Sequence, residues 1–326
     1  MSKITRFLAA SALIASPLTA QAADIEWDMA NEYNETSIHA EGDVVFSRTL
    51  SELTGGAIEI THHFSGSIGF RSADQLDAVG DGALPIADTY VGPLGGIDPM
   101  FLLPSLPFLA QTPADARRLF EAARPAYEEI FAANNQMLLW ASPWPPSGIW
   151  ANMAVDSAEA LSNLKIRTYD ANGTITLQEA GAAPIQLSWA DVVPQLSTGG
   201  IEAVLTSAEG GTNAKFWEHV SHFTEVNYAM PLNMIHINLD VWNDLSADHQ
   251  AAVLEAAKAA EDYVWSAVEE RVAQNYAEMR ENGMTVVTGV DSGFLNLLNE
   301  AGGQARADWL ESTGDKGQQI LDAFMN

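Results

Sequence analysis

The sequence predicts an α/β fold of two lobes, built on mixed sheets and braced by one long helix. Three observations lead to this prediction. The chain has 326 residues, which exceeds the size at which one hydrophobic core usually divides into two. Strand-like and helix-like patterns alternate along most of it, as they do in sheets covered by helices. Near the C-terminus, one helical pattern is longer than a single lobe requires.

Short strand patterns alternate with helix patterns from the N-terminal region to the middle of the chain. One segment shows a strand clearly, because Ile58 and Ile60 alternate with Glu59 and Thr61. The predicted strands cover residues 25–29, 58–64, 86–88, 166–169, 185–187 and 203–206. The predicted helices cover residues 37–53, 73–80, 114–133, 173–180 and 189–197. This order predicts mixed, mainly parallel sheets with helices on their faces.

The longest helical pattern begins at Ser246 and runs to Asn282. Serine is a good N-cap residue, and apolar residues such as Val253 and Val264 recur near helical spacing. An unbroken helix of this length would approach about 50 Å, so we expect it to brace both lobes. Gly283 fits a C-terminal stop. Two shorter helices separated by a break are the alternative.

The first residues have the composition of a secretory signal peptide. Lys3 and Arg6 precede an apolar run over residues 7–14, and Ala20-Gln21-Ala22 is a small-residue cleavage signal. An apolar run of about eight to fourteen residues is too short to span the roughly 30 Å hydrocarbon core of a membrane. We therefore expect residues 1–23 to be removed and the mature protein to be soluble in the periplasm.

Charge and cysteine content exclude several kinds of partner and site. The chain has 43 acidic and 15 basic residues and a net charge of −28, so nucleic acid and anionic membrane surfaces are repelled. It contains no cysteine, which excludes disulfides, a thiolate nucleophile and a lipid-modified cysteine anchor. We expect a monomer without a cofactor.

Sequence patterns typical of enzymes are mostly missing. The chain has no G-x-G-x-x-G, G-x-x-x-x-G-K-[ST] or G-x-S-x-G motif, so dinucleotide binding, a P-loop and a hydrolase nucleophile elbow lack their signatures. His62 and His63 would point to opposite faces of a strand. His219 and His222 could share a helix face, but a structural zinc site needs about four ligands. We predict no metal site and no catalysis; a periplasmic hydrolase or metal-dependent enzyme is the alternative.

Arg167 is the most informative single residue, because it lies on a predicted strand in a chain very poor in cations. Its guanidinium is always charged and presents a planar fork of donors that fits a carboxylate at two points. This residue predicts a site for a small anion. A salt bridge that stabilises one lobe is the alternative.

Tryptophan is abundant, and three of the nine fall in one proline-rich stretch as Trp140, Trp144 and Trp150. One interpretation is that they pack in the core, which we expect for two of the three. The other is that Trp144 or Trp150 forms an apolar or cation–π wall of a cleft. Ligand pockets are mostly apolar with a few converging polar groups, which such a wall and Arg167 would supply.

Six short segments are weak individually, but their order and spacing along residues 24–324 are specific as a set. They are Gly66-Ser67-Ile68-Gly69, residues 77–88, Leu106-Pro107-Phe108-Leu109, Leu164-Lys165-Ile166-Arg167, residues 181–186 and residues 195–202. On these segments the chain resembles the DctP-type solute-binding proteins of tripartite ATP-independent periplasmic (TRAP) transporters.

The resemblance implies two α/β lobes joined by crossing strands and a long helix, with a ligand held in the cleft between them. Lobe I would comprise residues 24–146 plus about 233–265, and lobe II residues 147–232 plus about 266–326. Ligand binding would close the lobes, and the closed form would deliver the solute to the membrane permease subunits. A ligand sensor without a transporter is an alternative.

The resemblance also implies positions for ligand contacts. The carboxylate-binding arginine of the family falls on Arg167, and the aromatic residue after the following strand falls on Trp189. Where many members have an asparagine, this chain has Thr206 or Ser207. Some relatives have a second arginine where this chain reads Ser147.

Glu32 and Tyr33 follow the first predicted strand, where relatives that bind zwitterions can present an acid. Glu32 is therefore a candidate partner for a ligand cation, and a solvated loop acid is the alternative. We expect Tyr33 to contribute from lobe I, and Trp189 with at least one of Trp144 and Trp150 to border the cleft. The predicted ligand is a compact monoanion or zwitterion with an apolar or aromatic part.

Overall fold

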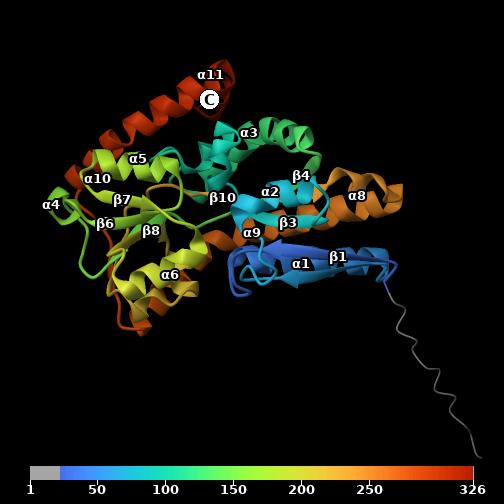
Figure 1. Ribbon diagram of the computed structural model, residues 1–326, viewed down its shortest axis with the longest axis horizontal. Helices are drawn as coiled ribbons and strands as arrows, with labels where there is room; N and C mark the ends of the chain where they lie inside the picture. The colour runs from blue at the N-terminus through green and yellow to red at the C-terminus, as the bar shows by residue number, and fades with distance from the viewer. Residues whose placement is uncertain (1–22, 326) are drawn as a thin grey trace, which may run out of the picture.

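The computed structural model describes residues 23–325 and contains two mixed β-sheets covered by helices. One sheet has five strands in the order β2-β1-β3-β10-β4, and the other has six in the order β11-β9-β5-β8-β6-β7. Figure 1 shows the five-stranded sheet on the right and the six-stranded sheet on the left. We call the two sheets with their helices lobe I and lobe II. The predicted α/β class with two lobes and mixed sheets is confirmed.

Lobe I is organised around a sheet in which one strand returns from the other lobe. Its strands are β1 (Ile25–Asn31), β2 (Ile58–His63), β3 (Ile86–Tyr90), β4 (Gln136–Pro143) and β10 (Leu232–Asn238). Strand β1 is parallel to β2 and β3, whereas β10 is antiparallel to β3 and β4. The register places Asn31 beside Asp88, at the end of the sheet that faces the other lobe.

The helices of lobe I begin where the sequence supplies capping residues. They are α1 (Ile38–Thr54), α2 (Ser72–Gly80), α3 (Pro113–Ala133) and α8 (Leu239–Asn243), with 3₁₀ segments η1 (Gly92–Gly96) and η2 (Pro99–Ser105). Ser37 Oγ accepts from Ala40 N at 3.2 Å at the start of α1, and Thr112 caps α3 in the same way. Gly55, at φ +64°, ends α1 in the left-handed conformation.

Lobe II holds the shorter strands and helices. Its strands are β5 (Ser147–Ala151), β6 (Lys165–Thr168), β7 (Ala183–Gln186), β8 (Ala203–Ser207), β9 (His222–Thr224) and β11 (Thr285–Val287). Its helices are α4 (Ala158–Leu161), α5 (Ala171–Glu179), α6 (Trp189–Thr198), α7 (Ala208–Asn213), α10 (Ser292–Ala301) and the 3₁₀ segment η3 (Phe216–Glu218). Strands β6, β7 and β8 run parallel, so the segments after them meet at one edge of the sheet, which faces lobe I.

Two chain crossings between the lobes lie side by side. The first connects β4 to β5, and the second connects β9 to β10. They are joined by backbone hydrogen bonds from Trp144 N to Pro231 O, from Ser147 N to Ala229 O and from Tyr228 N to Ser147 O, each at 2.9 Å. The crossings therefore form a narrow two-stranded connection between the sheets.

Helix α9 (Ala247–Glu281) is a single unbroken element of 35 residues, so the alternative of two shorter helices is wrong. Ser246 Oγ accepts from His249 N at 3.2 Å, and Asn282 is the C-cap. The helix packs on α1 and β4 in lobe I and on α7 and β11 in lobe II, and Figure 1 shows it running from one lobe to the other. It braces both lobes, as predicted.

Helix α11 (Gly303–Met325) also touches both lobes. It bends at Gly314, which has φ 56° and ψ −137°, and it packs on α5 of lobe II and on α3 and η2 of lobe I. Trp309, Ile320 and Phe324 lie in the same hydrophobic core as the lobe I helix α3. This helix therefore connects the lobes, whereas the division predicted from the sequence placed all of it in lobe II.

The predicted strands and helices up to residue 206 all occur, with ends that differ by at most a few residues. The antiparallel strands β4, β5, β9 and β10 were missed. Strands β4 and β5 lie in the proline-rich stretch around Trp144, where prolines hide the alternating pattern. The sheets are consequently more mixed than the expected mainly parallel arrangement.

Helices α1 and α9 approach closely at Gly42. A Cβ atom at this position would lie 2.6 Å from Val264 Cγ1, well inside van der Waals contact. We expect Gly42→Ala to lower the free energy of unfolding by about 1–3 kcal/mol through overpacking, despite the better helix propensity of alanine. Urea denaturation measures this change.

The double variant Gly42→Ala/Val264→Ala is the control, because it restores space between the two helices. The destabilisation in the double variant should be smaller than the sum of the two single effects. Strict additivity would show that contact between positions 42 and 264 does not limit how closely the helices pack.

Candidate functional site

A small cavity lies between the lobes. Both lobes and both crossings supply its walls. The lining residues are Tyr33, Tyr90, Trp144, Ser147, Arg167, Tyr169, Trp189, Thr206, Ser207 and Pro231. Seven of these, namely Tyr33, Trp144, Ser147, Arg167, Trp189, Thr206 and Ser207, were predicted from the sequence.

Arg167 lies at the centre of the site on β6 and is only 4% exposed. Its Nε donates to Leu187 O at 3.1 Å, and its guanidinium carbon lies 5.6 Å from the Trp189 ring centre and 5.9 Å from the Tyr169 ring centre. Within residues 23–325 it forms no salt bridge to a carboxylate, and burial lowers its pKa. A buried cation without a counter-ion is costly, so this environment favours binding of an anion. The alternative of a stabilising salt bridge is not observed.

Hydroxyl groups line the same cavity on the lobe II side. Ser147 is on β5 at the crossing, and its Oγ lies 3.1 Å from Tyr169 Oη. Thr206 and Ser207 end β8, and Ser207 Oγ accepts from Gly210 N at 3.0 Å as the N-cap of α7. These groups can donate or accept hydrogen bonds, which allows the cavity to bind polar atoms of a ligand in addition to its anion.

Aromatic rings form the lobe I side of the cavity. Tyr33 and Trp144 meet edge to face with ring centres 4.6 Å apart, and Tyr33 lies 5.8 Å from Trp189. Behind them, buried His39 packs 4.1 Å from Trp144, and burial lowers its pKa to about 3. The ring is therefore neutral at pH 7, and the wall presents mainly apolar surface.

Two predicted residues lie outside the cavity lining. Trp150 is fully buried in the core of lobe II, and its Nε1 donates to Ser207 O at 3.2 Å, so it supports the site from behind. Glu32 is also buried, and its Oε2 accepts from Ser72 N at 3.0 Å and Ser72 Oγ at 2.7 Å. Glu32 lines the spaces beside the cavity, and the solvated-loop alternative for it is wrong because it is buried.

Tyr90, Tyr169 and Pro231 line the cavity and were not predicted. Tyr169 lies two residues after Arg167, so the alternation of a strand could have indicated it. Tyr90 ends β3, and its hydroxyl lies 3.4 Å from Asp170 Oδ2. No sequence signal separates Pro231 from the other prolines of the chain.

Arg71 connects the lobes beside the cavity. It precedes α2 in lobe I, and its Nη1 donates to Ser188 Oγ at 3.0 Å and to Asp191 Oδ2 at 3.3 Å in lobe II. Arg71 also borders the open spaces on both sides of this contact. Because its side chain is about half exposed, the contact marks the solvent edge of the cleft.

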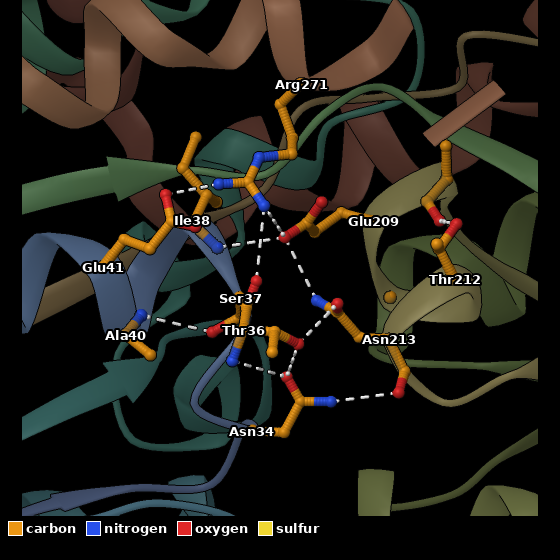
Figure 2. Close-up of polar contacts among 12 residues, drawn as sticks. Asn34, Thr36, Ser37, Ile38, Ala40, Glu41, Glu209, Thr212, Asn213 and Arg271 are labelled. Carbon is orange, nitrogen blue, oxygen red and sulfur yellow. Dashed lines mark hydrogen bonds and ion pairs between the residues drawn. The ribbon is translucent and has the colours of Figure 1, made fainter. Parts of the chain in front are cut away.

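A second group of polar contacts joins the start of α1 to α7, and Figure 2 shows it. Glu209 on α7 accepts from Ile38 N at 2.9 Å, and Arg271 on α9 lies 3.5 Å from the same carboxylate and pairs with Glu41. Burial raises the pKa of Glu209, while Arg271 lowers it. The carboxylate thus bridges lobe II to the first turn of a lobe I helix, where a helix dipole favours negative charge.

Further hydrogen bonds extend the same contact. Asn34 Nδ2 donates to Asn213 O at 3.0 Å, and Thr36 Oγ1 donates to Asn213 Oδ1 at 3.1 Å. We refer to Glu209, Asn213 and their partners Asn34, Thr36 and Ile38 as the interlobe latch. Its lobe II residues directly follow Thr206 and Ser207, which line the cavity.

The histidine pairs show no metal site. Among residues 23–325, no group of three or more histidines and acids is placed to hold a metal ion. His222 Nδ1 lies 2.8 Å from Ser221 Oγ, and His63 Nε2 lies 2.6 Å from Asp28 Oδ1.

Comparison with known proteins identifies the family. Residues 29–292 match the DctP family, described as bacterial extracellular solute-binding protein, family 7. The chain belongs to this family. It is a solute-binding protein of the TRAP type, as the resemblance implied. The ectoine-binding periplasmic protein TeaA of Halomonas elongata is 24% identical over 91% of this chain and 88% of its own.

Solved structures of the family share the fold. A TRAP solute-binding protein from a marine metagenome, described as specific for pyroglutamate and in complex with it, is 31% identical with a TM-score of 0.88. The match covers 94% of this chain and 99% of that one. DctP6 of Bordetella pertussis, described as binding pyroglutamic acid, is 27% identical with a TM-score of 0.88 over 92% and 99% of the chains. These relatives are binding proteins and not enzymes.

The expected signal peptide falls largely outside the described residues, which start at residue 23. From there to residue 325, no helix has the length and apolar character needed to cross a membrane. TRAP solute-binding proteins are periplasmic, in line with the location expected from the sequence.

Proposed function

We propose that this protein binds a small organic monocarboxylate between its lobes, with Arg167 as the anion anchor. The observation that supports this most directly is the buried guanidinium that lacks a carboxylate partner among the described residues. A bidentate pair with a ligand carboxylate would supply the missing counter-ion and satisfy donors that the protein leaves free. Bound anion would therefore remove an energetic cost that the empty site carries.

We further propose that the ligand is a compact cyclic acid of the size and polarity of pyroglutamate. The cavity is small and walled by both lobes, which favours a compact ligand. Its aromatic wall suits a flat ring, and Ser147, Thr206 and Ser207 can bond to a ring amide. Relatives with 27–31% identity are described as pyroglutamate-binding, which supports the same ligand class.

A zwitterion is less well supported than a monoanion. The sequence suggested Glu32 as the partner of a ligand cation, as would suit an ectoine-like solute. Glu32 Oε2 accepts from Ser72 and Oε1 has no hydrogen-bond partner among the described residues, but the side chain lies beside the cavity and not in its lining. We therefore favour a ligand without a full positive charge.

We also propose that the protein acts in the periplasm as a non-catalytic monomer that delivers its ligand to TRAP permease subunits after cleavage of residues 1–23. Family membership supports this role. Closure would occur by rotation about the two crossings, with lobes divided near residues 146, 232 and 265. The interlobe latch and the Arg71 contact can form only when the lobes are close, so they would favour the closed state.

Arg167 provides the first test of this function. We expect Arg167→Ala to weaken pyroglutamate binding at least about 100-fold, because a buried charge pair is lost. The affinity of Arg167→Lys should fall between those of Arg167→Ala and wild type, since a lysine keeps the charge but cannot reproduce the fork. Isothermal titration calorimetry measures both.

Lys165→Ala is a matched control, because Lys165 is an exposed cation on the same strand. Its dissociation constant should stay within about twofold of wild type. Near-wild-type affinity in a folded Arg167→Ala variant would refute the anion anchor.

Closure provides the second test. We expect Glu209→Gln to weaken the latch, because the charge that attracts Arg271 and the α1 N-terminus is removed. The ligand-free variant should then populate open forms more and show a larger radius of gyration by small-angle scattering, with ligand restoring the compact form.

Glu121→Gln is the control for this effect. Glu121 also pairs with an arginine, but its partner Arg117 lies on the same lobe I helix α3, so no contact between the lobes is changed. Its radius of gyration should match wild type. If wild type, Glu209→Gln and the control variant all have the same radius of gyration without ligand, a role of Glu209 in closure is contradicted.

A further inference from the structure

Two buried carboxyl groups lie in lobe I behind the aromatic wall of the cavity and are not part of its lining. Asp43 is on α1 and Asp88 is on β3, and both are 0% exposed. Asn31 Nδ2 donates to both, at 2.8 Å to Asp43 Oδ2 and at 3.0 Å to Asp88 Oδ2. Asn233 Nδ2 on β10 donates to the other oxygen of Asp88 at 2.7 Å. Four side chains from four elements therefore form one buried network.

The network contains a proton on one of its two carboxyl groups. Neither Asp43 nor Asp88 forms a salt bridge within residues 23–325, and two unpaired carboxylates so close together would repel each other. Burial, and then the charge of Asp88, raises the pKa of Asp43 well above its usual value. Burial raises the pKa of Asp88 to about 7, against the hydrogen bond from Asn233. Asp43 is thus the neutral member, and Asp88 is the acceptor.

As an acceptor, Asp88 fixes the orientation of two asparagine side chains. Both oxygens of Asp88 receive NH₂ groups, so Asn31 and Asn233 must each turn their nitrogen toward Asp88 and their oxygen away from it. A flipped amide would place its oxygen against the carboxylate. The carboxylate therefore determines where both amide oxygens point.

These two oxygens hold two walls of the ligand cavity. Asn31 Oδ1 accepts from Tyr33 N at 2.8 Å, and Asn233 Oδ1 accepts from Trp144 Nε1 at 2.8 Å. Tyr33 and Trp144 are the lobe I residues that meet edge to face in the cavity. Tyr90, two residues after Asp88 on β3, lies on the same face of the strand and also lines the cavity.

We propose that Asp88 is a positioning residue for ligand binding, which sets Tyr33 and Trp144 through the amides of Asn31 and Asn233. This proposal rests on the proposed ligand site between the lobes. Asp88 itself does not touch the cavity. Its role is to make one arrangement of the aromatic wall the only one that pairs both Tyr33 N and Trp144 Nε1.

Asp88→Asn tests the proposal with a side chain of the same shape. The new amide has one oxygen for two donors, so its NH₂ group must face the NH₂ group of Asn31 or Asn233. The amide that flips then turns its own NH₂ group toward Tyr33 N or Trp144 Nε1. At about pH 8, where Asp88 of the wild type is ionised, we expect pyroglutamate to bind about tenfold or more weakly.

Two further variants separate positioning from general damage to the core. Asp43→Asn is the matched control, because its amide can accept from Asn31 and donate to Asp88 as neutral Asp43 does, so affinity should stay within about twofold. The exchange Asp88→Asn/Asn233→Asp moves the carboxylate to position 233. There it accepts from both the amide now at position 88 and Trp144 Nε1, while the oxygen of that amide accepts from Asn31, so affinity should return.

The indole N–H signal of Trp144 gives a readout that needs no ligand. In ¹⁵N-labelled protein, assigned with Trp144→Phe, this signal should shift in Asp88→Asn when Asn233 is the amide that flips, and the backbone N–H signal of Tyr33 should shift when Asn31 flips. Both signals should stay in place in Asp43→Asn and return toward their wild-type positions in the exchange variant. If wild type does not bind pyroglutamate, the proposed ligand is wrong, and the two N–H signals still decide whether Asp88 positions Tyr33 and Trp144.

The proposal is overturned if Asp88→Asn leaves both N–H signals and the affinity unchanged, or if Asp43→Asn disturbs them equally. If Asp88→Asn does not fold, the exchange variant Asp88→Asn/Asn233→Asp alone tests the proposal. A folded exchange variant that has lost the wild-type indole environment would contradict the proposal, and one that keeps it would support it, because only the positions of carboxylate and amide differ.

Discussion

The arrangement of the site follows from one constraint, which is a buried guanidinium without a counter-ion among the described residues. Arg167 packs on aromatic rings and has no carboxylate within salt-bridge distance, so the protein itself compensates its desolvation only in part. The hydroxyls that line the cavity are neutral, so they can reduce the free-energy cost of burying this guanidinium but cannot cancel it. The chain is strongly acidic overall, but screening limits exposed charges to about 8 Å at physiological salt, so Arg167 can govern its own cavity.

The two lobes make different contributions to this cavity. Lobe II supplies the charge and most hydroxyls from the ends of parallel strands, where side chains meet at one edge of a sheet. Lobe I supplies rings, and rings need to be held at fixed angles if they are to select a ligand by shape. The Asp88 network supplies that restraint through hydrogen bonds that face away from the cavity. Charge recognition and shape recognition are thus built on separate sheets.

Local patterns predicted the parts of this structure that depend on neighbours in sequence. The helix from Ser246, the βα units and Arg167 on its strand all follow from spacing, capping and residue type. Trp144 and Trp150 could not be separated, because which one faces the cavity depends on a turn between β4 and β5 that the prolines obscure. Asp88 could not be recognised either, since its partners come from β1, β10 and α1 and meet only in the folded chain.

Ligand contact and lobe closure are linked by one short segment of lobe II. Thr206 and Ser207 line the cavity, and Glu209 and Asn213 form the interlobe latch only a few residues later. Ser207 also caps α7, the helix that carries both latch residues. A ligand that bonds to these hydroxyls stabilises the same helix that reaches the start of α1. Because the loop before α1 carries Tyr33, the closed latch in turn holds an aromatic wall against the ligand, so each contact strengthens the other.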